Sequence, residues 1–201
     1  MKTNRHLVVF AKEPMMGRVK TRLGHDIGMV AATRFYRRTL ADVLRRMGND
    51  GRWKCWLALC PDKSTSGKPF WPNSFTALKQ GGGDIGERMG RAMAGMQPGP
   101  VVIIGTDVPA IAPHHIEAAF NALGRHDVVF GPAVDGGYWL VGARRSPCTP
   151  QLFKQVRWSS KHALADSLAK AERKQLKVAQ LETLDDVDDG AAYKKWLTGA
   201  L

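Results

Sequence analysis

Residues 101–109 read VVIIGTDVP and decide the fold class. Four apolar β-branched residues in a row are typical of a central strand in a parallel sheet, because both faces of such a strand are buried. Asp107 follows the strand directly. A carboxylate at the end of a buried strand needs a partner, and a divalent cation is the usual partner at a phosphate site. The alternative is that Asp107 caps the following turn, with Pro109 setting the loop.

Apolar runs and helical stretches alternate on both sides of this strand, which predicts an α/β fold. We expect a three-layer α/β/α sandwich with a mostly parallel, Rossmann-like central sheet, and residues 1–201 as a single domain. Strands are expected at 7–11, 53–59, 75–78, 101–104, 127–130, 138–141 and 176–179, and helices at 30–47, 85–96, 113–123, 159–172 and 190–197.

The composition favours a cytoplasmic protein. No apolar run approaches the ~18 residues of a membrane span, and Lys12 and Glu13 interrupt the first apolar stretch where a signal peptide would continue. The three cysteines, Cys55, Cys60 and Cys148, have no metal-ligand spacing, so reduced thiols are expected. A net charge of +12 suits a polyanionic partner, although a well-solvated basic surface explains it equally well.

The segment 12–22 (KEPMMGRVKTR) is the first candidate for binding phosphate. It follows the first strand, and ligands of open α/β sheets bind outside the carboxyl ends of strands. Its cations are Lys12, Arg18, Lys20 and Arg22, while Gly17 permits close approach of a ligand. Neither the P-loop pattern nor GxGxxG is present. A basic surface loop is the alternative.

The segment 131–140 (GPAVDGGYWL) is the second candidate. Gly136 and Gly137 let the main chain approach a ligand. Asp135 could bind a metal, accept a hydrogen bond from a hydroxyl group or act as a base. Tyr138 and Trp139 could stack on a base or line an acceptor pocket. The alternative is a tight turn with core aromatics.

Two further segments are candidates. Gln80 and Asp84 to Arg88 (QGGGDIGER from 80) would lie at another strand end and could contact a base or ribose, but a helix cap explains Asp84 equally well. An acidic cluster could supply a second metal carboxylate or form a solvated turn; it contains Asp185, Asp186 and Asp188. Four histidines lack metal-ligand spacing, and we interpret them as structural or exposed: His114, His115, His126 and His162.

Four motifs in this order resemble a known family: FAKEPMMGRVKTRL (10–23), GDIGERM (83–89), VVIIGTDVPAI (101–111) and GPAVDGGYWLVG (131–142). WSS at 158–160 and LDDVDD at 184–189 fit its later part. The chain resembles the glycosyltransferase-like family associated with radical-SAM/selenodomain genes and proposed to act in arsenosugar biosynthesis. The resemblance covers nearly the whole chain.

The resemblance implies the nucleotide-diphospho-sugar transferase fold, which guanylyltransferases also share. It implies that Asp107 holds Mg²⁺ or Mn²⁺ on the nucleotide phosphates. Asp135 or Asp188 would have to complete the metal site, and Asp188 is the second ligand that we expect. The expected nucleotide contacts are Ala11, Lys12, Gly17, Arg18, Lys20, Arg22, Gln80, Asp84, Arg88 and Thr106, and the expected acceptor contacts are Gly136, Gly137, Tyr138 and Trp158. The sequence has T-D-V-P where metal-dependent glycosyltransferases have a DxD triplet.

Three functions therefore stay open. The first is metal-assisted glycosyl transfer from a nucleotide sugar to a small acceptor, with Asp107 and Asp135 as catalytic residues. The second is nucleotidyl transfer from a nucleoside triphosphate, with release of pyrophosphate. The third is non-enzymatic binding of a polyanion or nucleic acid, which no nucleic-acid-binding motif supports. The sequence leaves the oligomeric state, base, sugar and acceptor undetermined.

Overall fold

The predicted strands all join one sheet. The computed structural model describes residues 4–65, 71–146 and 149–199. Within these residues the sheet has seven strands: β1 (His6–Lys12), β2 (Lys54–Cys60), β3 (Phe75–Lys79), β4 (Val101–Ile104), β5 (Val128–Pro132), β6 (Tyr138–Ala143) and β7 (Val178–Gln180).

The strand order is β3-β2-β1-β4-β6-β5-β7. β1 pairs in parallel with β2 on one side and with β4 on the other, so that Val9 lies between Leu57 and Ile104. β6 runs antiparallel to both β4 and β5. The predicted mostly parallel sheet is confirmed, and the carboxyl ends of β1, β2, β3 and β4 meet at one edge.

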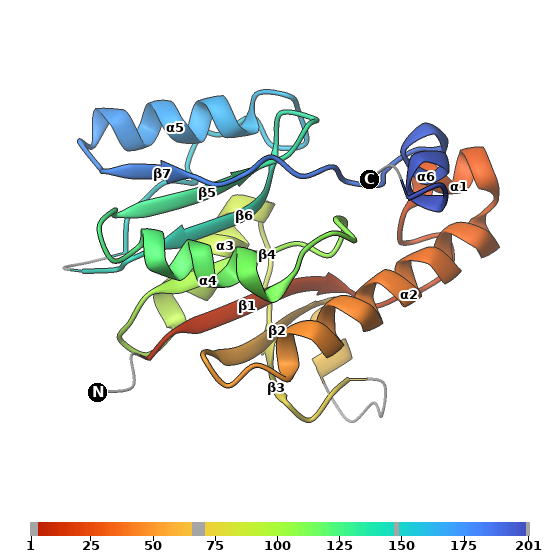
Figure 1. Ribbon diagram of the computed structural model, residues 1–201, viewed down its shortest axis with the longest axis horizontal. Helices are drawn as coiled ribbons and strands as arrows, with labels where there is room; N and C mark the ends of the chain where they lie inside the picture. Colours follow the sequence, from red (N-terminus) through yellow and green to blue (C-terminus); the bar gives the residue numbers. More distant parts are fainter. Residues whose placement is uncertain (1–3, 66–70, 147–148, 200–201) are drawn as a thin grey trace.

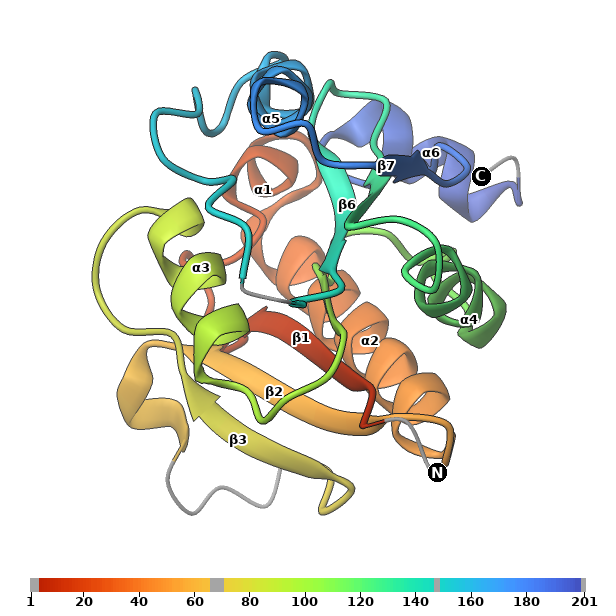
Figure 2. The ribbon, with the colours of Figure 1, turned by 90° about the vertical axis from the view of Figure 1, so that its left-hand side faces the viewer.

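Helices cover both faces of the sheet, which gives the predicted three layers (Figures 1 and 2). The helices are α1 (Thr21–Ile27), α2 (Met29–Gly48), α3 (Ile85–Gly95), α4 (Pro113–Ala122), α5 (Ala163–Arg173) and α6 (Gly190–Leu197). Figure 2 shows α3 and α5 on one side of the sheet and α2 and α4 on the other.

The alternation of side chains along β1 explains why this strand is apolar throughout its central part, from Leu7 to Ala11. Leu7 and Val9 belong to the core that includes α2 and α4, whereas Val8 and Phe10 belong to the core that includes α3 and α5. Because successive side chains point to opposite faces, a strand covered on both sides must be apolar throughout.

Two elements differ from the sequence expectations. α1 was not predicted, because residues 12–22 were interpreted as a continuous loop, and the chain becomes helical at Thr21. α5 begins at Ala163 and not at residue 159, because Ser159 has a left-handed backbone (φ 55°) that interrupts a right-handed helix. The chain from Trp158 to His162 is therefore a loop.

Two of the three cysteines lie in the described residues. Cys55 and Cys60 are free thiols, and burial raises the pKa of Cys55 to about 11. Cys148 lies outside the described residues. None of the helices in the described ranges is long and apolar enough to cross a membrane.

Candidate functional site

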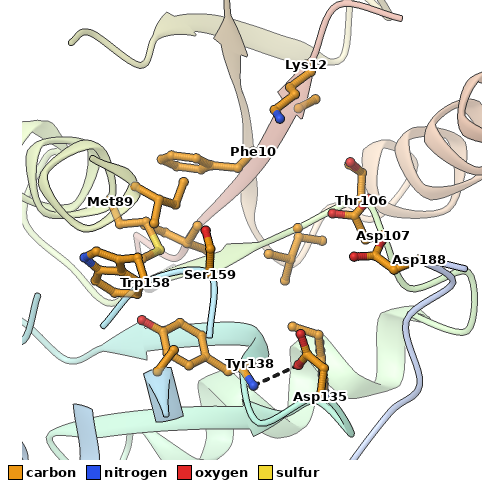
Figure 3. A pocket seen from close by; sticks show the side chains of 18 of the residues that line it. Phe10, Lys12, Met89, Thr106, Asp107, Asp135, Tyr138, Trp158, Ser159 and Asp188 are labelled. Carbon is orange, nitrogen blue, oxygen red and sulfur yellow. Dashed lines mark hydrogen bonds between the residues drawn. The ribbon is translucent and has the colours of Figure 1, made fainter. Parts of the chain in front are cut away.

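A cavity of about 490 Å³ opens over the carboxyl ends of β1 and β4 and the start of β6 (Figure 3). Its volume lies in the range of small-molecule sites. It gathers most of the predicted site residues from segments far apart in the sequence: Ala11, Lys12, Lys20, Arg22, Gln80, Arg88, Thr106, Asp107, Asp135, Gly137, Tyr138, Trp158 and Asp188.

One ammonium group joins the two carboxylates that were predicted to hold a metal. Lys20 Nζ lies 2.6 Å from Asp107 Oδ1 and 2.5 Å from Asp188 Oδ1. The Lys20 side chain is only 4% exposed, against 55% for Asp107 and 39% for Asp188. The ammonium is therefore buried beside two carboxylates that remain open to solvent.

The Lys20 ammonium is stably charged in this arrangement. Burial alone would lower its pKa, but the negative charges of Asp107 and Asp188 outweigh this effect and raise the pKa above the ordinary lysine value. The Lys20 backbone is left-handed (φ 48°, ψ 46°) at the start of α1, and its carbonyl accepts the Gly24 N–H at 2.8 Å.

Asp188 reaches the site because the acidic segment after β7 crosses the ends of the strands. The Val187 N–H donates to the Asp107 carbonyl at 3.1 Å, and the Val187 side chain is fully buried with Leu23 and Phe35. Gly190 N–H donates to the Asp26 carboxylate of α1 at 2.7 Å. Asp188 is thus fixed next to Asp107 by its neighbours in the chain.

Tyr36 of α2 fixes the end of β1 against the loop that follows β4. The Lys12 N–H donates to the Tyr36 hydroxyl at 2.9 Å, and that hydroxyl is 3.1 Å from the Lys12 carbonyl, to which it donates. Thr106 Oγ1 lies 3.4 Å from the same hydroxyl. Burial raises the pKa of Tyr36 to about 12, so it is a neutral structural group.

The Asp135 turn packs tightly against the loop before α5. Asp135 Oδ1 accepts the Gly137 N–H at 2.8 Å. Gly136 has φ 85°, and a Cβ there would meet the Lys161 carbonyl carbon at 2.8 Å, so both backbone angle and space require glycine.

Burial, followed by the charges of Asp188 and Asp135, raises the pKa of nearby Asp186 to about 6.

Three aromatic rings and one methionine form the opposite side of the cavity (Figure 3). We call this group the aromatic wall; its members are Phe10, Met89, Tyr138 and Trp158. The rings of Tyr138 and Trp158 meet edge to face, with centroids 6.3 Å apart. Burial raises the pKa of Tyr138 above the ordinary tyrosine value. A Cβ at Gly86 of α3 would lie 2.7 Å from Trp158 Cε2, so the indole rests directly on the helix backbone.

Four predicted site residues do not line the cavity: Gly17, Arg18, Asp84 and Gly136. Asp84 forms a capping box with Glu87 at the start of α3, which is the alternative that the sequence left open. Gln80 lines the cavity but also serves the fold, since its amide donates to the Ala58 carbonyl at 2.9 Å.

Several cavity residues were not predicted from the sequence. Tyr36 was assigned only to the core face of its helix, and apolar periodicity does not reveal where a hydroxyl points. Ser159 and Ser160 line the cavity because α5 begins later than expected. Their place in the WSS motif was the available signal.

A second group of possible metal ligands lies outside the cavity wall. His114, His115 and Glu182 offer ligand atoms within 4.8 Å of one another. The sequence does not reveal this group, because Glu182 lies far from the two histidines along the chain. His115 Nδ1 accepts the Ala112 N–H at 2.8 Å, which leaves the ring proton of neutral His115 on Nε2, where it faces Glu182 at 2.9 Å. This tautomer does not present a free Nε2 lone pair to a metal.

The strand order of the described sheet, with β6 antiparallel to both of its neighbours, is that of the nucleotide-diphospho-sugar transferase fold. The profile of the family DUF2064, described as an uncharacterized protein family conserved in bacteria, matches residues 43–160. This is more than half of the chain, which therefore belongs to the DUF2064 family. Curated proteins gave no sequence match.

Solved structures give the same fold. A candidate nucleotide-diphospho-sugar transferase from Desulfovibrio desulfuricans G20 is 30% identical, with a TM-score of 0.86 over 96% of this chain and 86% of that chain. CMP:2-keto-3-deoxy-manno-octonic acid synthetase complexed with CTP is 13% identical (TM-score 0.57; 99% and 100%). A manganese complex of Rv0371C from Mycobacterium tuberculosis H37Rv is 17% identical (TM-score 0.53; 98% of each chain).

Proposed function

We propose that the protein is a nucleotide-dependent transferase that moves a glycosyl group from a nucleotide-diphospho-sugar to a small acceptor with the help of Mg²⁺ or Mn²⁺. The observation that carries the proposal is the convergence of Asp107 and Asp188 on one cation, Lys20 Nζ, at a cavity of about 490 Å³. The relative from D. desulfuricans, a candidate nucleotide-diphospho-sugar transferase, supports the same class.

The donor set fits a divalent cation. Two carboxylate oxygens from separate segments already lie around a positively charged atom, and oxygen ligands are what Mg²⁺ and Mn²⁺ prefer. Asp107 and Asp188 would hold the ion, which when bound supplies positive charge to the leaving diphosphate. The structure of Rv0371C with manganese supports this choice of metal, and the His114, His115 and Glu182 group is the competing location.

The chain's own groups divide the cavity into two halves. Lys12 and Arg22 bring positive charge to the side of β1 and α1, where they would bind phosphate oxygens that remain outside the metal. Asp135 lies across the cavity from this side, at the start of β6. It would orient the acceptor hydroxyl or take its proton, with Tyr138 and Trp158 beside the acceptor.

Nucleotidyl transfer from a nucleoside triphosphate is the second candidate. The structural relative that was solved with CTP favours it, as does the absence of a DxD triplet at Asp107. Lys12, Lys20 and Arg22 would then bind the β- and γ-phosphates, and pyrophosphate would leave. The same cavity serves both reactions, because a nucleotide sugar and a triphosphate share the nucleoside and its diphosphate.

The acceptor is proposed only as a class. The likeness to the radical-SAM-associated family suggests a small hydroxyl compound of arsenosugar biosynthesis, and this suggestion rests on sequence motifs alone. A non-enzymatic polyanion binder is the remaining alternative, and the net charge of +12 is what favours it.

Thermal unfolding with nucleotides tests the proposal. A ligand at 100 times its Kd adds about 2.7 kcal/mol of stability. We expect a nucleotide sugar to raise the Tm only when Mg²⁺ or Mn²⁺ is present, and we expect Asp107→Ala to remove this response. A larger shift with a triphosphate would favour nucleotidyl transfer. Metal-independent binding that survives in Asp107→Ala would contradict both enzymatic mechanisms, and salt-sensitive binding of oligonucleotides without any nucleotide response would favour the polyanion binder.

A further inference from the structure

Lys20 was expected to bind phosphate, but its ammonium is engaged with the two carboxylates expected to bind the metal. We propose that Lys20 is an internal counterion that competes with the divalent metal for Asp107 and Asp188 and is released to the substrate phosphates when nucleotide binds. The inference rests on the proposed function and adds a regulation of the same site: metal and nucleotide bind cooperatively, and metal alone binds weakly.

The geometry makes the competition direct. Lys20 Nζ lies within 2.6 Å of one oxygen of each carboxylate. A Mg²⁺ ion takes its oxygen ligands at about 2.0–2.1 Å. An ion bound to the same two oxygens would therefore occupy nearly the position of Nζ, and the ammonium and the ion cannot both be there.

The charges lead to the same conclusion even if the metal binds the other oxygen of each carboxylate. Asp107 and Asp188 together carry two negative charges, of which Lys20 neutralises one. Arg22 Nη1 lies 3.9 Å from Asp188 Oδ2 and adds a further positive charge at the surface. A divalent ion entering this group meets a buried ammonium within a few ångströms, where repulsion is only partly screened.

Nucleotide phosphates would reverse this penalty. The Lys20 side chain is a flexible stem with a single charged tip, and it lines the same cavity as Lys12 and Arg22. Phosphate oxygens in that cavity would give the ammonium a new partner, and Asp107 and Asp188 would then be free to hold the metal. Each ligand then removes the obstacle to the other, which by linkage makes their binding mutually favourable.

Lys20→Met is the direct test, because it removes the ammonium and keeps an unbranched apolar stem. Mn²⁺ binding is measured by calorimetry and by the electron paramagnetic resonance signal of free Mn²⁺. Without any phosphate compound, we expect Lys20→Met to bind Mn²⁺ about tenfold more tightly than the wild type, or more. Lys12→Met is the matched control, because it removes one charge from the same cavity without touching the carboxylate pair, and we expect a smaller change.

The cooperativity is tested with inorganic pyrophosphate, the unit that nucleotide sugars and triphosphates share. The titration is repeated with pyrophosphate and corrected for the Mn²⁺–pyrophosphate complex formed without protein. We expect pyrophosphate to raise the Mn²⁺ affinity of the wild type strongly and that of Lys20→Met only slightly. Lys20→Arg, which keeps the charge, guards against loss of structure: it is expected to bind Mn²⁺ no more tightly than the wild type.

The outcomes separate this inference from the proposed function. If Mn²⁺ binding requires Asp107 but Lys20→Met binds it equally or more weakly, the competition is wrong and the transferase site stands. If Asp107→Asn binds Mn²⁺ as well as the wild type does, the metal site itself is wrong, and the inference falls with it. Tighter binding in Lys20→Met together with lost cooperativity supports the inference.

Discussion

The two sides of the cavity are built in different ways. On one side, Lys20, Asp107 and Asp188 form a charged triad whose two carboxylates are open to solvent. On the other, Trp158 rests on the backbone of Gly86 and is held by packing. Carboxylates that are open to solvent can be reached by a ligand, whereas close packing resists displacement. The charged triad is therefore the adjustable part of the site, and the aromatic wall is its fixed part.

The largest effect is expected at the charged triad. Asp107→Asn removes one charge while keeping the size of the side chain, and the carboxylate is too exposed for its loss to unfold the protein. We expect turnover with the nucleotide identified by thermal shift to fall about 10²–10³-fold, as for loss of other groups that stabilise developing charge. Asp42→Asn, in a surface pair with Arg45 on α2, is the control and should leave turnover unchanged. Equal turnover in Asp107→Asn would show that the triad has no part in the reaction.

A second effect is expected at the aromatic wall. Gly86→Ala places a methyl group against the Trp158 indole, and overpacking of this kind costs about 1–3 kcal/mol. Gly95→Ala lies in the same helix, where a Cβ has open space, and should stabilise the protein by about 0.5–1 kcal/mol. The free energy of unfolding in urea measures both.

Trp158→Ala sharpens this second comparison. If the wall is rigid, the cost of Gly86→Ala must disappear when the indole is absent, so the double variant should be more stable than the sum of the single changes predicts. A Gly86→Ala variant as stable as Gly95→Ala would show that Trp158 moves freely, and the contrast between an adjustable and a fixed side would be lost.

A third prediction concerns Tyr36, which joins the end of β1 to the loop after β4 on the side of the charged triad. Tyr36→Phe removes the hydrogen bond that the Lys12 N–H donates at 2.9 Å, and the net loss of a partly buried hydrogen bond costs about 0.5–1.5 kcal/mol. Thr106→Val removes only a 3.4 Å contact to the same hydroxyl and should cost less. Thermal and urea unfolding would reveal the order, and a larger loss in Thr106→Val would contradict the assigned roles.

The smallest effect is expected at the opposite end of the sheet. Burial, followed by the charges of Lys54 and Arg145, lowers the pKa of His6 below 6.5, and Trp56 Nε1 donates to its Nδ1 at 3.1 Å. A pKa that is lower in the folded protein gives stability that is present above pH 6.5 and is lost as the pH falls through the folded value. His6→Asn should therefore lose less stability than the wild type between pH 7 and pH 5. An identical pH dependence would show that His6 is not held neutral.

The sequence was a good guide to the sheet and a partial guide to the site. The β-branched run of β4 and the buried run of β1 identify their strands because a doubly covered strand must be apolar. Strand ends then place Asp107 and Lys12 at one edge. The cytoplasmic location and the single domain over 1–201 stay predictions.

The remaining features of the site depend on contacts between segments that are far apart in the sequence, and no local pattern encodes such contacts. Asp188 joins Asp107 through the Val187 N–H, and Lys20 turns away from the solvent toward both acids. For Asp84, the sequence predicts a nucleotide contact and a helix cap equally well. Its place three residues before Glu87 suits the cap, and the structure contains the cap. The loop after Trp158 was mistaken for a helix because its composition does not forbid one, while the left-handed Ser159 does.

A crystal structure with Mn²⁺ and a nucleotide would locate the metal, because manganese gives an anomalous signal. We expect one anomalous peak between the carboxylates of Asp107 and Asp188, with the Lys20 ammonium moved from that position to a phosphate oxygen. A peak at His114, His115 and Glu182 alone, with Lys20 still between the two acids, would contradict it.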